Sequence, residues 1–253
     1  MRSIKLTLAY DGTAYAGWQV QPGETTLQEV LERAIERITG QQVRAIASGR
    51  TDAGVHALGQ VVGFRTETHL SADVLRRALN AELPHDVAVL EAADADGGFH
   101  PIRDAVRKCY RYVIHDGPVR DVFRRRYCWQ YHRRLDDAAM ARAARPLLGT
   151  HDFSSFETSG AKRKDSIRTI YRLSVERGRG AEQDFITIEI EADGFLYNMV
   201  RAIVGSLVEV GRGAEDESWV AQVLAAADRR AAGPTAPPQG LFLVSVDYEG
   251  SDD

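Results

Sequence analysis

Residues 47–64, which read ASGRTDAGVHALGQVVGF, bring an arginine, a carboxylate and a histidine together among glycines. Two apolar runs flank them, so Arg50, Asp52 and His56 are expected on or beside a turn between two strands. Glycines let the backbone bend there and let a substrate approach closely. A carboxylate pushed out of a sheet in this way can act as a nucleophile. The alternative is that Asp52 caps the turn through its own backbone and pairs with Arg50.

Other reaction types have less support in the sequence. The single carboxylate of this segment does not fit the paired-carboxylate mechanism of hydrolases. No Walker loop, dinucleotide-binding glycine fingerprint or metal-binding histidine pair occurs in the sequence. Cys109 and Cys128 stand in apolar or aromatic contexts without a second cysteine or histidine at metal-ligand spacing. Both are therefore expected to be buried free thiols, and no metal site is expected.

The elements around the turn alternate between strands and helices. Thr26 and Glu29 have the spacing of a capping box, and an apolar helical stripe runs from there until Gly40 ends it. A second amphipathic helix is expected at 72–83. Strands are expected at residues 4–10, 43–48, 59–66, 86–93 and 105–117. The order in this half is therefore β-α-β-β-α-β-β.

The remainder of the chain repeats a similar order. Helices are expected within residues 136–149, 195–211 and 217–228, and strands at 167–178, 184–193 and 242–248. Two α+β halves, 1–104 and 105–253, are the expected domains. A cleft between them is the expected place for a large ligand.

Composition bounds the class of protein. The chain has 253 residues, of which 44% are hydrophobic, enough for a substantial core. No stretch approaches the roughly 20 consecutive apolar residues of a membrane helix, and the first residues enter a strand pattern instead of a signal peptide. We therefore expect a cytoplasmic protein that does not contact a membrane.

The charge is unevenly distributed along the sequence. The net charge is −4, yet residues 100–172 hold 17 Lys and Arg against 8 Asp and Glu. Three clusters, at 107–114, 120–134 and 161–172, interleave these basic residues with aromatic ones. One such cluster is typical of a solvated strand face, but three together favour a nucleic-acid partner, because phosphates attract local positive charge.

Six ordered blocks resemble one known family, the tRNA pseudouridine synthase A family. The blocks are YDGTAYAGWQVQ (10–21), GRTDAGVHALGQVVGF (49–64), FHPIRDAVRKCYRYVI (99–114), GTHDFSSF (149–156), GFLYNMVRAIVGSLVEVG (194–211) and GLFLVSVDY (240–248). The resemblance spans nearly the whole chain. It implies an α+β fold of two ferredoxin-like halves, which form an extended, mainly antiparallel sheet with helices on one face and an RNA-binding cleft between the halves.

The resemblance also implies an activity. Proteins similar to this one isomerise uridines at positions 38–40 of the tRNA anticodon stem-loop to pseudouridine, as homodimers and without a cofactor or a metal. Asp52 falls on the family's nucleophilic aspartate and Arg50 on the arginine two residues earlier. Tyr110 falls on the tyrosine that stacks on the target base, Arg201 on the arginine that pairs with the aspartate, and Leu241 on an apolar residue of the pocket.

Several assignments keep an alternative at this stage. Tyr110 also fits a core residue of an alternating strand, and Arg201 a helix-surface residue whose charge reaches water. His56 is grouped with the substrate-binding residues, although we expect it to hold the turn by hydrogen bonds rather than to act as a base. Trp18, with its neighbour Gln19, is expected to contact RNA or to pack under the turn.

One block departs from the family pattern. Where the family has FHAR, this chain has Pro101 and Ile102, with an arginine only at Arg103. On a strand, a shift by one residue changes the face of the side chain, so a local RNA contact is expected to be missing or displaced. The remaining Lys and Arg of residues 120–134 and 162–172 are expected to contact phosphates as a group.

Two other function classes remain open from the sequence. A non-catalytic RNA-binding module or tRNA chaperone would bind tRNA and leave its uridines unchanged. A metal-dependent phosphodiesterase would use scattered acids, which the absence of ligand spacing disfavours.

Overall fold

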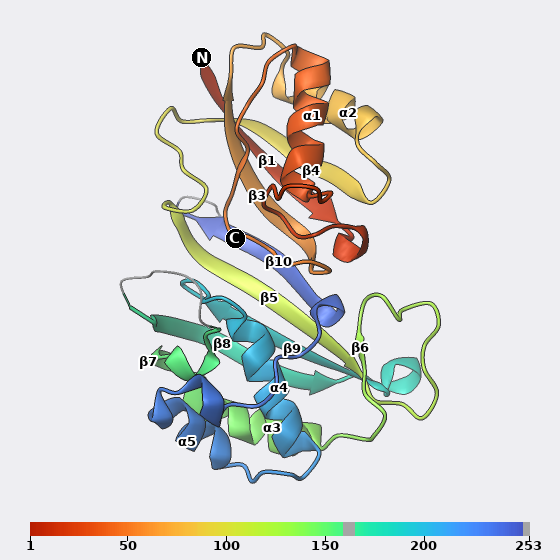
Figure 1. The fold of residues 1–253 in the computed structure, drawn as a ribbon, viewed down its shortest axis with the longest axis vertical. Helices are drawn as coiled ribbons and strands as arrows, with labels where there is room; N and C mark the ends of the chain where they lie inside the picture. Colours follow the sequence, from red (N-terminus) through yellow and green to blue (C-terminus); the bar gives the residue numbers. More distant parts are fainter. Residues whose placement is uncertain (159–164, 250–253) are drawn as a thin grey trace. The chain divides into compact units, whose positions relative to one another are not determined.

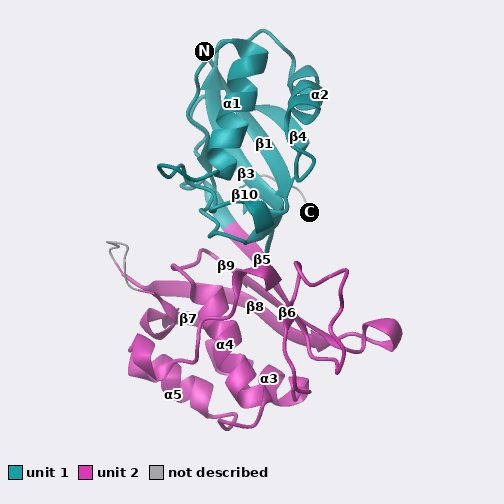
Figure 2. Ribbon diagram, turned by 45° about the vertical axis from the view of Figure 1, so that its right-hand side comes forward, with its two compact units in different colours: residues 1–106, 242–253 teal, residues 107–241 magenta. Residues whose placement is uncertain are grey.

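A computed structural model describes residues 1–158 and 165–249, in two compact units. Unit 1 comprises Met1–Val106 and the segment that begins at Phe242, and unit 2 comprises Arg107–Leu241 (Figure 2). The expected halves, 1–104 and 105–253, have nearly the same internal boundary but assign the closing strand to the second half. In the structure that strand pairs with a strand of unit 1, a long-range contact that has no local signature in the sequence.

Unit 1 is a sheet with two packed helices (Figure 1). Its strands are β1 (Arg2–Tyr10), β2 (Ile46–Ala47), β3 (His56–Thr66), β4 (Val87–Ala95) and β10 (Leu241–Tyr248), and its helices are α1 (Leu27–Thr39) and α2 (Ala72–Glu82). The strand order is β4-β1-β3-β10, with β2 added beside β3. β10 is parallel to β3, and the other pairs are antiparallel. The predicted β-α-β-β-α-β-β order is confirmed once the first residues of β5 are counted.

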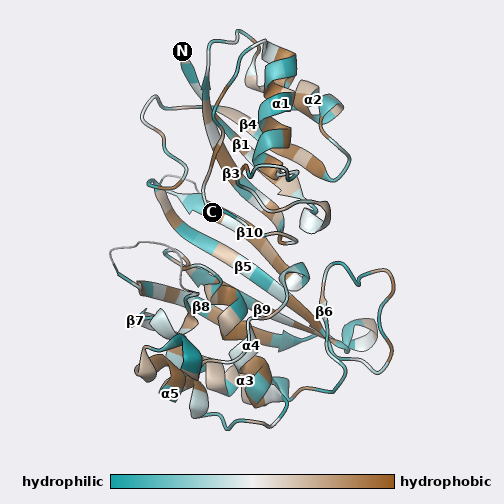
Figure 3. Ribbon diagram, viewed as in Figure 1, coloured by the Kyte–Doolittle hydropathy of each residue, from teal (hydrophilic) through white to brown (hydrophobic). Residues whose placement is uncertain are grey.

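Helix α1 has the predicted position but not the predicted capping box. Its hydrophilic and hydrophobic residues lie on different faces (Figure 3), and Gly40 ends it in the left-handed region at φ 69°. Thr26 is the N-cap, yet its side chain makes no capping bond, and its Oγ1 is buried without a hydrogen-bond partner in the described residues. Glu29 instead forms an ion pair with Arg33 at 2.6 Å. The prediction of a capping box is therefore wrong, because the Thr26 side chain faces the interior instead of the helix N-terminus.

Unit 2 contains the remaining strands and has helices of its own. Its strands are β5 (Ala105–His115), β6 (Trp129–Gln130), β7 (Gly149–Asp152), β8 (Ile167–Arg177) and β9 (Phe185–Ala192), and its helices are α3 (Asp137–Ala144), α4 (Met199–Gly211) and α5 (Trp219–Ala226). The order is β5-β9-β8-β7, all antiparallel, and β6 lies parallel to β5. The predicted α+β class with a mainly antiparallel sheet is confirmed.

Several local details of unit 2 differ from the expectation, among them the end of α3, which lies at Ala144 rather than near Gly149. Helix α4 begins at Met199 rather than at Phe195, because Asn198 adopts the left-handed conformation at φ 61° and interrupts the backbone. Strand β7 was not anticipated, since its four residues carry no alternation of apolar and polar side chains. Cys109 and Cys128 are buried free thiols, as predicted, and burial raises the pKa of Cys128 to about 11.

The core of unit 2 includes a buried carboxylate. The Asp116 side chain has no exposed surface and accepts hydrogen bonds from two amino groups of Arg177, both at 2.9 Å, and from the Leu135 amide at 2.9 Å. Arg177 also donates to Asp137 at 2.6 Å, and Arg134 donates to Asp116 at 3.2 Å. Burial alone would raise the pKa of Asp116, but these bonds and charges outweigh it and lower the pKa.

None of the helices in the described ranges, 1–158 and 165–249, is both long enough and apolar enough to cross a membrane.

Candidate active site

The candidate turn, residues 48–55, connects β2 and β3 in unit 1 and is held by hydrogen bonds to buried side chains. Ser48 Oγ donates to Gln60 Oε1 at 2.7 Å, and Gln60 Nε2 donates to the carbonyl of Gly49 at 2.8 Å. The hydroxyls of Tyr10 and Thr51 lie 2.8 Å apart in a hydrogen bond. Burial raises the pKa of Tyr10 to about 12, so this phenol is neutral at physiological pH. These buried bonds hold the part of the turn that precedes Asp52.

The first loop of the chain packs against the same turn. Trp18 is only 3% exposed, and its amide donates to the carbonyl of Thr51 at 2.9 Å. Of the two expectations for Trp18, packing under the turn is therefore confirmed. Gly17 is left-handed at φ 94°, and a Cβ there would lie 2.8 Å from the Thr51 carbonyl oxygen. A Cβ on Gly12 would lie 2.0 Å from the carbonyl oxygen of Val55, so both glycines are required by close backbone approach.

Asp52 stands at the outer part of this fixed turn. Its carbonyl accepts from the Val55 amide at 3.1 Å, Gly54 is left-handed at φ 77°, and the Asp52 side chain is half-exposed. Arg50 is exposed and forms no hydrogen bond or ion pair with any residue of the described chain. The alternative in which Arg50 pairs with Asp52 is therefore wrong.

His56 begins β3 and is 1% exposed. The amide of Gly12 donates to its Nδ1 at 3.1 Å, and the Asp11 carboxylate lies 3.1 Å from the same nitrogen. Its ring stacks on Phe242 of β10, with centroids 4.8 Å apart. His56 thus connects the first loop, the candidate turn and the closing strand of unit 1. This agrees with the structural role expected for it.

Tyr110 and Leu241 belong to unit 2. Tyr110 lies on β5, is 9% exposed and makes an edge contact with the Phe195 ring at a centroid distance of 5.0 Å. Two residues along the strand, Tyr112 is fully buried and donates to the carbonyl of Pro237 at 2.7 Å. Leu241 is the first residue of β10 and is 6% exposed. Tyr110 is therefore a largely buried aromatic, and its contact with a target base stays a prediction.

Arg201 lies in the first turn of α4, where hydrogen bonds to other residues of unit 2 hold its guanidinium. Nε donates to the carbonyl of Ala236 at 2.7 Å, and Nη1 donates to Oδ1 of Asn198 at 2.9 Å. In return, the Ala236 amide donates to the carbonyl of Arg201 at 3.0 Å. The side chain is oriented by protein groups rather than extended into water, so the surface-residue alternative is wrong. Asn198 was missed from the sequence, although a polar residue directly before an apolar helix is a usable signal.

We expect Gly205→Ala to disturb this arrangement. A Cβ on Gly205 would lie 1.7 Å from the carbonyl oxygen of Pro234, so the segment that holds Arg201 must move. Alanine favours a helix over glycine by about 1 kcal/mol, but overpacking costs about 1–3 kcal/mol or more. We expect a net loss of stability in urea unfolding and at least about tenfold lower turnover, in keeping with the sensitivity of catalysis to misplaced groups.

Gly97→Ala is the matched control, because nothing lies within 4 Å of a Cβ at that position. Its unfolding midpoint and turnover should equal those of the wild type. An unchanged Gly205→Ala variant would show that residues 234–236 adapt without cost.

The structure shows the surroundings of Pro101, where the sequence differs from the family's FHAR pattern. Residues 101–104 form a turn rather than a strand, so the expected change of strand face does not apply. A Cβ on Gly63 would lie 2.7 Å from the Pro101 ring, which shows how closely the proline packs on β3. Arg103 is exposed and pairs with Asp104 at 2.8 Å.

The predicted phosphate-binding residues divide into groups. Lys162, Arg163 and Lys164 lie outside the described residues. On the sheet of unit 2, several arginines pair with two glutamates of β9, Glu189 and Glu191, as a solvated strand face would: these are Arg107, Arg111 and Arg172. In contrast, Arg120, Arg125, Arg126 and Arg133 are exposed on the segment that follows β5. The group assignment stays a prediction.

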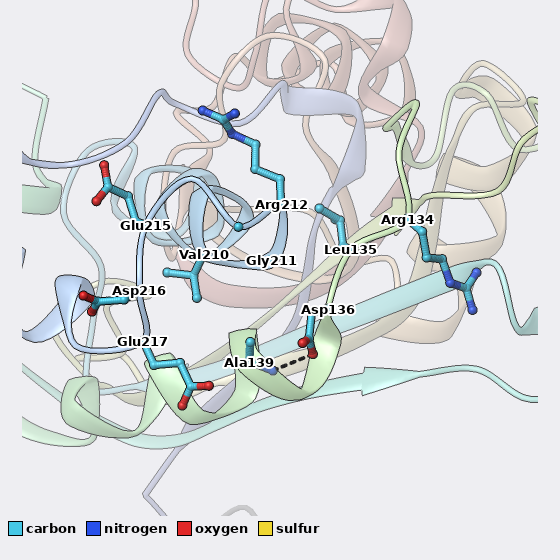
Figure 4. Close-up of a pocket in the computed structure, with 11 residues that line it drawn as sticks. Arg134, Leu135, Asp136, Ala139, Val210, Gly211, Arg212, Glu215, Asp216 and Glu217 are labelled. Carbon is cyan, nitrogen blue, oxygen red and sulfur yellow. Dashed lines mark hydrogen bonds between the residues drawn. The ribbon is translucent and has the colours of Figure 1, made fainter.

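A hollow of about 610 Å³ in unit 2 is lined by none of the candidate catalytic residues, and by Arg134 of the predicted phosphate-binding group (Figure 4). It lies between α3 and the end of α4, and acidic and basic side chains both line it, among them Asp136, Arg212 and Glu217. Asp136 is already used as the N-cap of α3, where it accepts from the Ala139 amide at 2.9 Å. This hollow therefore has no clear connection with the predicted chemistry.

Comparison with known proteins decides the family. The family model described as tRNA pseudouridine synthase matches residues 7–101 and 143–249 of this chain, and these ranges include Asp52, Arg201 and Leu241. The chain belongs to the tRNA pseudouridine synthase family. Family membership assigns an isomerase that converts uridine to pseudouridine in tRNA, as the sequence blocks predicted. The RNA-chaperone and phosphodiesterase alternatives gain no support.

Individual synthases resemble the chain over its whole length. The tRNA pseudouridine synthase A of Thermoanaerobacter sp. (strain X514) is 47% identical over 98% of this chain and 100% of the relative. That of Pelobacter propionicus is 46% identical over the same shares. Among solved structures, a chain in the crystal structure of a Cbf5-Nop10-Gar1 complex matches at 14% identity and a TM-score of 0.37, covering 90% of this chain and 60% of that one.

Proposed function

We propose that this synthase isomerises uridines at positions 38–40 of the tRNA anticodon stem-loop, with Asp52 as the nucleophile. The observation that carries the proposal is the fixed backbone around a half-exposed Asp52, held by Tyr10, Gln60 and the close approach of Gly17. A nucleophile needs such preorganisation, because each misplaced ångström reduces the rate.

A uridine within a stem must leave the helix before Asp52 can reach it. Flipping the base costs a few kcal/mol, less near a loop. Stacking on the Tyr110 ring, at about 1–3 kcal/mol, would offset much of this cost. Arg50 is exposed and has no partner in the described chain, so it is available to fill the space that the base vacates or to bind the adjacent phosphate.

Arg201 is proposed to keep Asp52 ionised and oriented by pairing with it. The bonds to Ala236 and Asn198 hold the guanidinium in one orientation, which suits a positioning role. A nearby positive charge favours the carboxylate over the carboxylic acid. Leu241 is proposed to line the uracil pocket, and His56 to support the turn from beneath it.

The reaction balances without an external reactant. Asp52 adds to C1′ of the ribose or to C6 of uracil, the N1–C1′ bond breaks, and the base turns so that C5 joins C1′. The hydrogen on C5 then leaves as a proton, N1 takes up one proton in its place, and the carboxylate is released. The atoms of uridine and pseudouridine are therefore the same.

The decisive test measures tritium released from tRNA transcripts labelled at C5 of uracil, in the presence of a chelator. Release should depend on a uridine at position 38, 39 or 40, and should vanish when all three are replaced by cytidine. Release from the replaced transcript would contradict the site assignment, and no release from any tRNA that binds would contradict the activity.

We also infer a cytoplasmic homodimer, supported by the resemblance to the synthase A family. Sedimentation at several protein concentrations measures the dimer. A folded monomer with full turnover would overturn this part of the proposal.

A further inference from the structure

The segment between β5 and β6 in unit 2 exposes large apolar side chains. Phe123 is 89% exposed, Val119 77% and Val122 51%. A phenylalanine this exposed loses the stabilisation that burial would give it, about 2–3 kcal/mol. A surface that gathers such side chains in one loop is commonly an interaction site.

This loop, residues 117–127, is held in place by specific hydrogen bonds and ion pairs. One carboxylate oxygen of Asp121 accepts from the amides of Phe123 and Arg124, both at 2.9 Å, and the other accepts from Arg124 Nε at 2.9 Å. The Arg124 guanidinium covers the ring of Phe185 at 3.6 Å and pairs with Glu182 at 2.6 Å. The backbone at Phe123 is thus fixed to β9, and the exposure of the ring follows from specific contacts.

The charge around Phe123 indicates the kind of partner. Asp121 is the only acid of the loop, and its carboxylate is occupied by Arg124 and two amides. Arg120, Arg125 and Arg126 are exposed within three residues of the ring. A second copy of this loop would bring like charges together, whereas RNA supplies both phosphates for the arginines and flat bases for the ring.

We propose that Phe123 stacks on an unpaired base of the tRNA substrate, while Arg120, Arg125 and Arg126 contact the phosphates beside it. The proposal rests on the proposed function, because it takes tRNA as the substrate. It makes the 117–127 loop a second contact with the RNA, and Phe123 a residue that sets affinity for unpaired nucleotides. An aromatic ring suits this role without selecting a particular base, since every base has a face on which to stack.

The test measures tRNA binding separately from turnover. Filter binding with an unmodified tRNA transcript should show a 5- to 150-fold weaker Kd for Phe123→Ala, the range that one stacked base gives. Phe123→Trp should restore the affinity, and Val119→Ala in the same loop should bind as the wild type does. A blunt RNA duplex without unpaired nucleotides should bind Phe123→Ala and wild type equally.

Salt dependence separates stacking from charge. Arg125→Ala should reduce the slope of log Kd against log salt by about 0.7–0.9, and Phe123→Ala should leave this slope unchanged. Sedimentation of Phe123→Ala tests the competing partner: a lost dimer would mean that the ring contacts a second copy, and would overturn the proposal. A Kd for tRNA within twofold of wild type would overturn it as well.

These outcomes remain distinct from failure of the proposed activity. A wild type that binds tRNA through Phe123 but releases no tritium would contradict the isomerase and leave the stacking contact in place. If instead the wild type releases tritium, and Phe123→Ala has the same Kd and KM for tRNA as the wild type, the isomerase activity stands and the stacking contact is contradicted.

Discussion

Asp52→Asn lowers turnover by at least about 10⁴-fold and leaves tRNA binding nearly unchanged, if the carboxylate is the nucleophile. The amide has almost the same shape as the carboxylate but cannot donate an electron pair to carbon with comparable ease. The turn itself is held by the hydrogen bonds of Tyr10 and Gln60 and by backbone bonds. The variant should therefore fold normally.

The measurement is single-turnover tritium release, with filter binding of the same tRNA in parallel. Asp96→Asn is a suitable control, because Asp96 is an exposed carboxylate of unit 1 outside the turn. It should release tritium at the wild-type rate. Retained turnover in Asp52→Asn would remove Asp52 from the chemistry, and a loss of binding equal to the loss of rate would make it a binding residue instead.

Asp116→Asn should cost about 3–5 kcal/mol of unfolding free energy, because removing one partner of a buried pair leaves the other uncompensated. Asp116 is fully enclosed, and Arg177 is its main partner, so the loss is larger than for surface pairs. Urea unfolding measures the effect. Glu217→Gln, which removes an exposed ion pair with Arg142, should unfold near the wild-type midpoint.

The pH dependence of this pair has a definite sign. The pKa of Asp116 in the folded protein is lowered relative to the unfolded chain, where an aspartate titrates near 3.9. The stabilisation that ionised Asp116 gives to the fold is therefore complete above its pKa in the unfolded chain. It is lost as the pH falls through its lower pKa in the folded protein. The stability of the wild type should fall below about pH 4, and more steeply than that of Asp116→Asn. Equal acid slopes would show that other carboxylates control acid unfolding.

The sequence predicted those features that depend on local pattern. The 3.6-residue period of α1 and the left-handed Gly40 that ends it are local, and both were found as expected. The position of Asp52 on a turn between strands was also predictable, because glycines and flanking apolar runs define it. The six motif blocks imply roles for Tyr110 and Arg201 that no periodicity could provide, and these roles stay predictions.

Features that depend on distant contacts were not predictable. The inward orientation of the Thr26 side chain is decided by packing, so the capping-box pattern was misleading. The bonds from Arg201 to Ala236 join residues separated by α5 and a long loop. The exposed Arg50 similarly shows that two opposite charges two residues apart need not pair, because the turn geometry directs them separately.

The parallel pairing of β10 with β3 has a consequence for synthesis of the protein. Phe242, which stacks on His56 beneath the candidate turn, is made only after all of unit 2 has been translated. Unit 2 is continuous in the chain, so it can begin to fold while unit 1 still lacks a strand. A ribosome-bound chain that stops before β10 would therefore lack the Phe242 ring that supports His56, and the candidate turn would be completed only after unit 2 has been made.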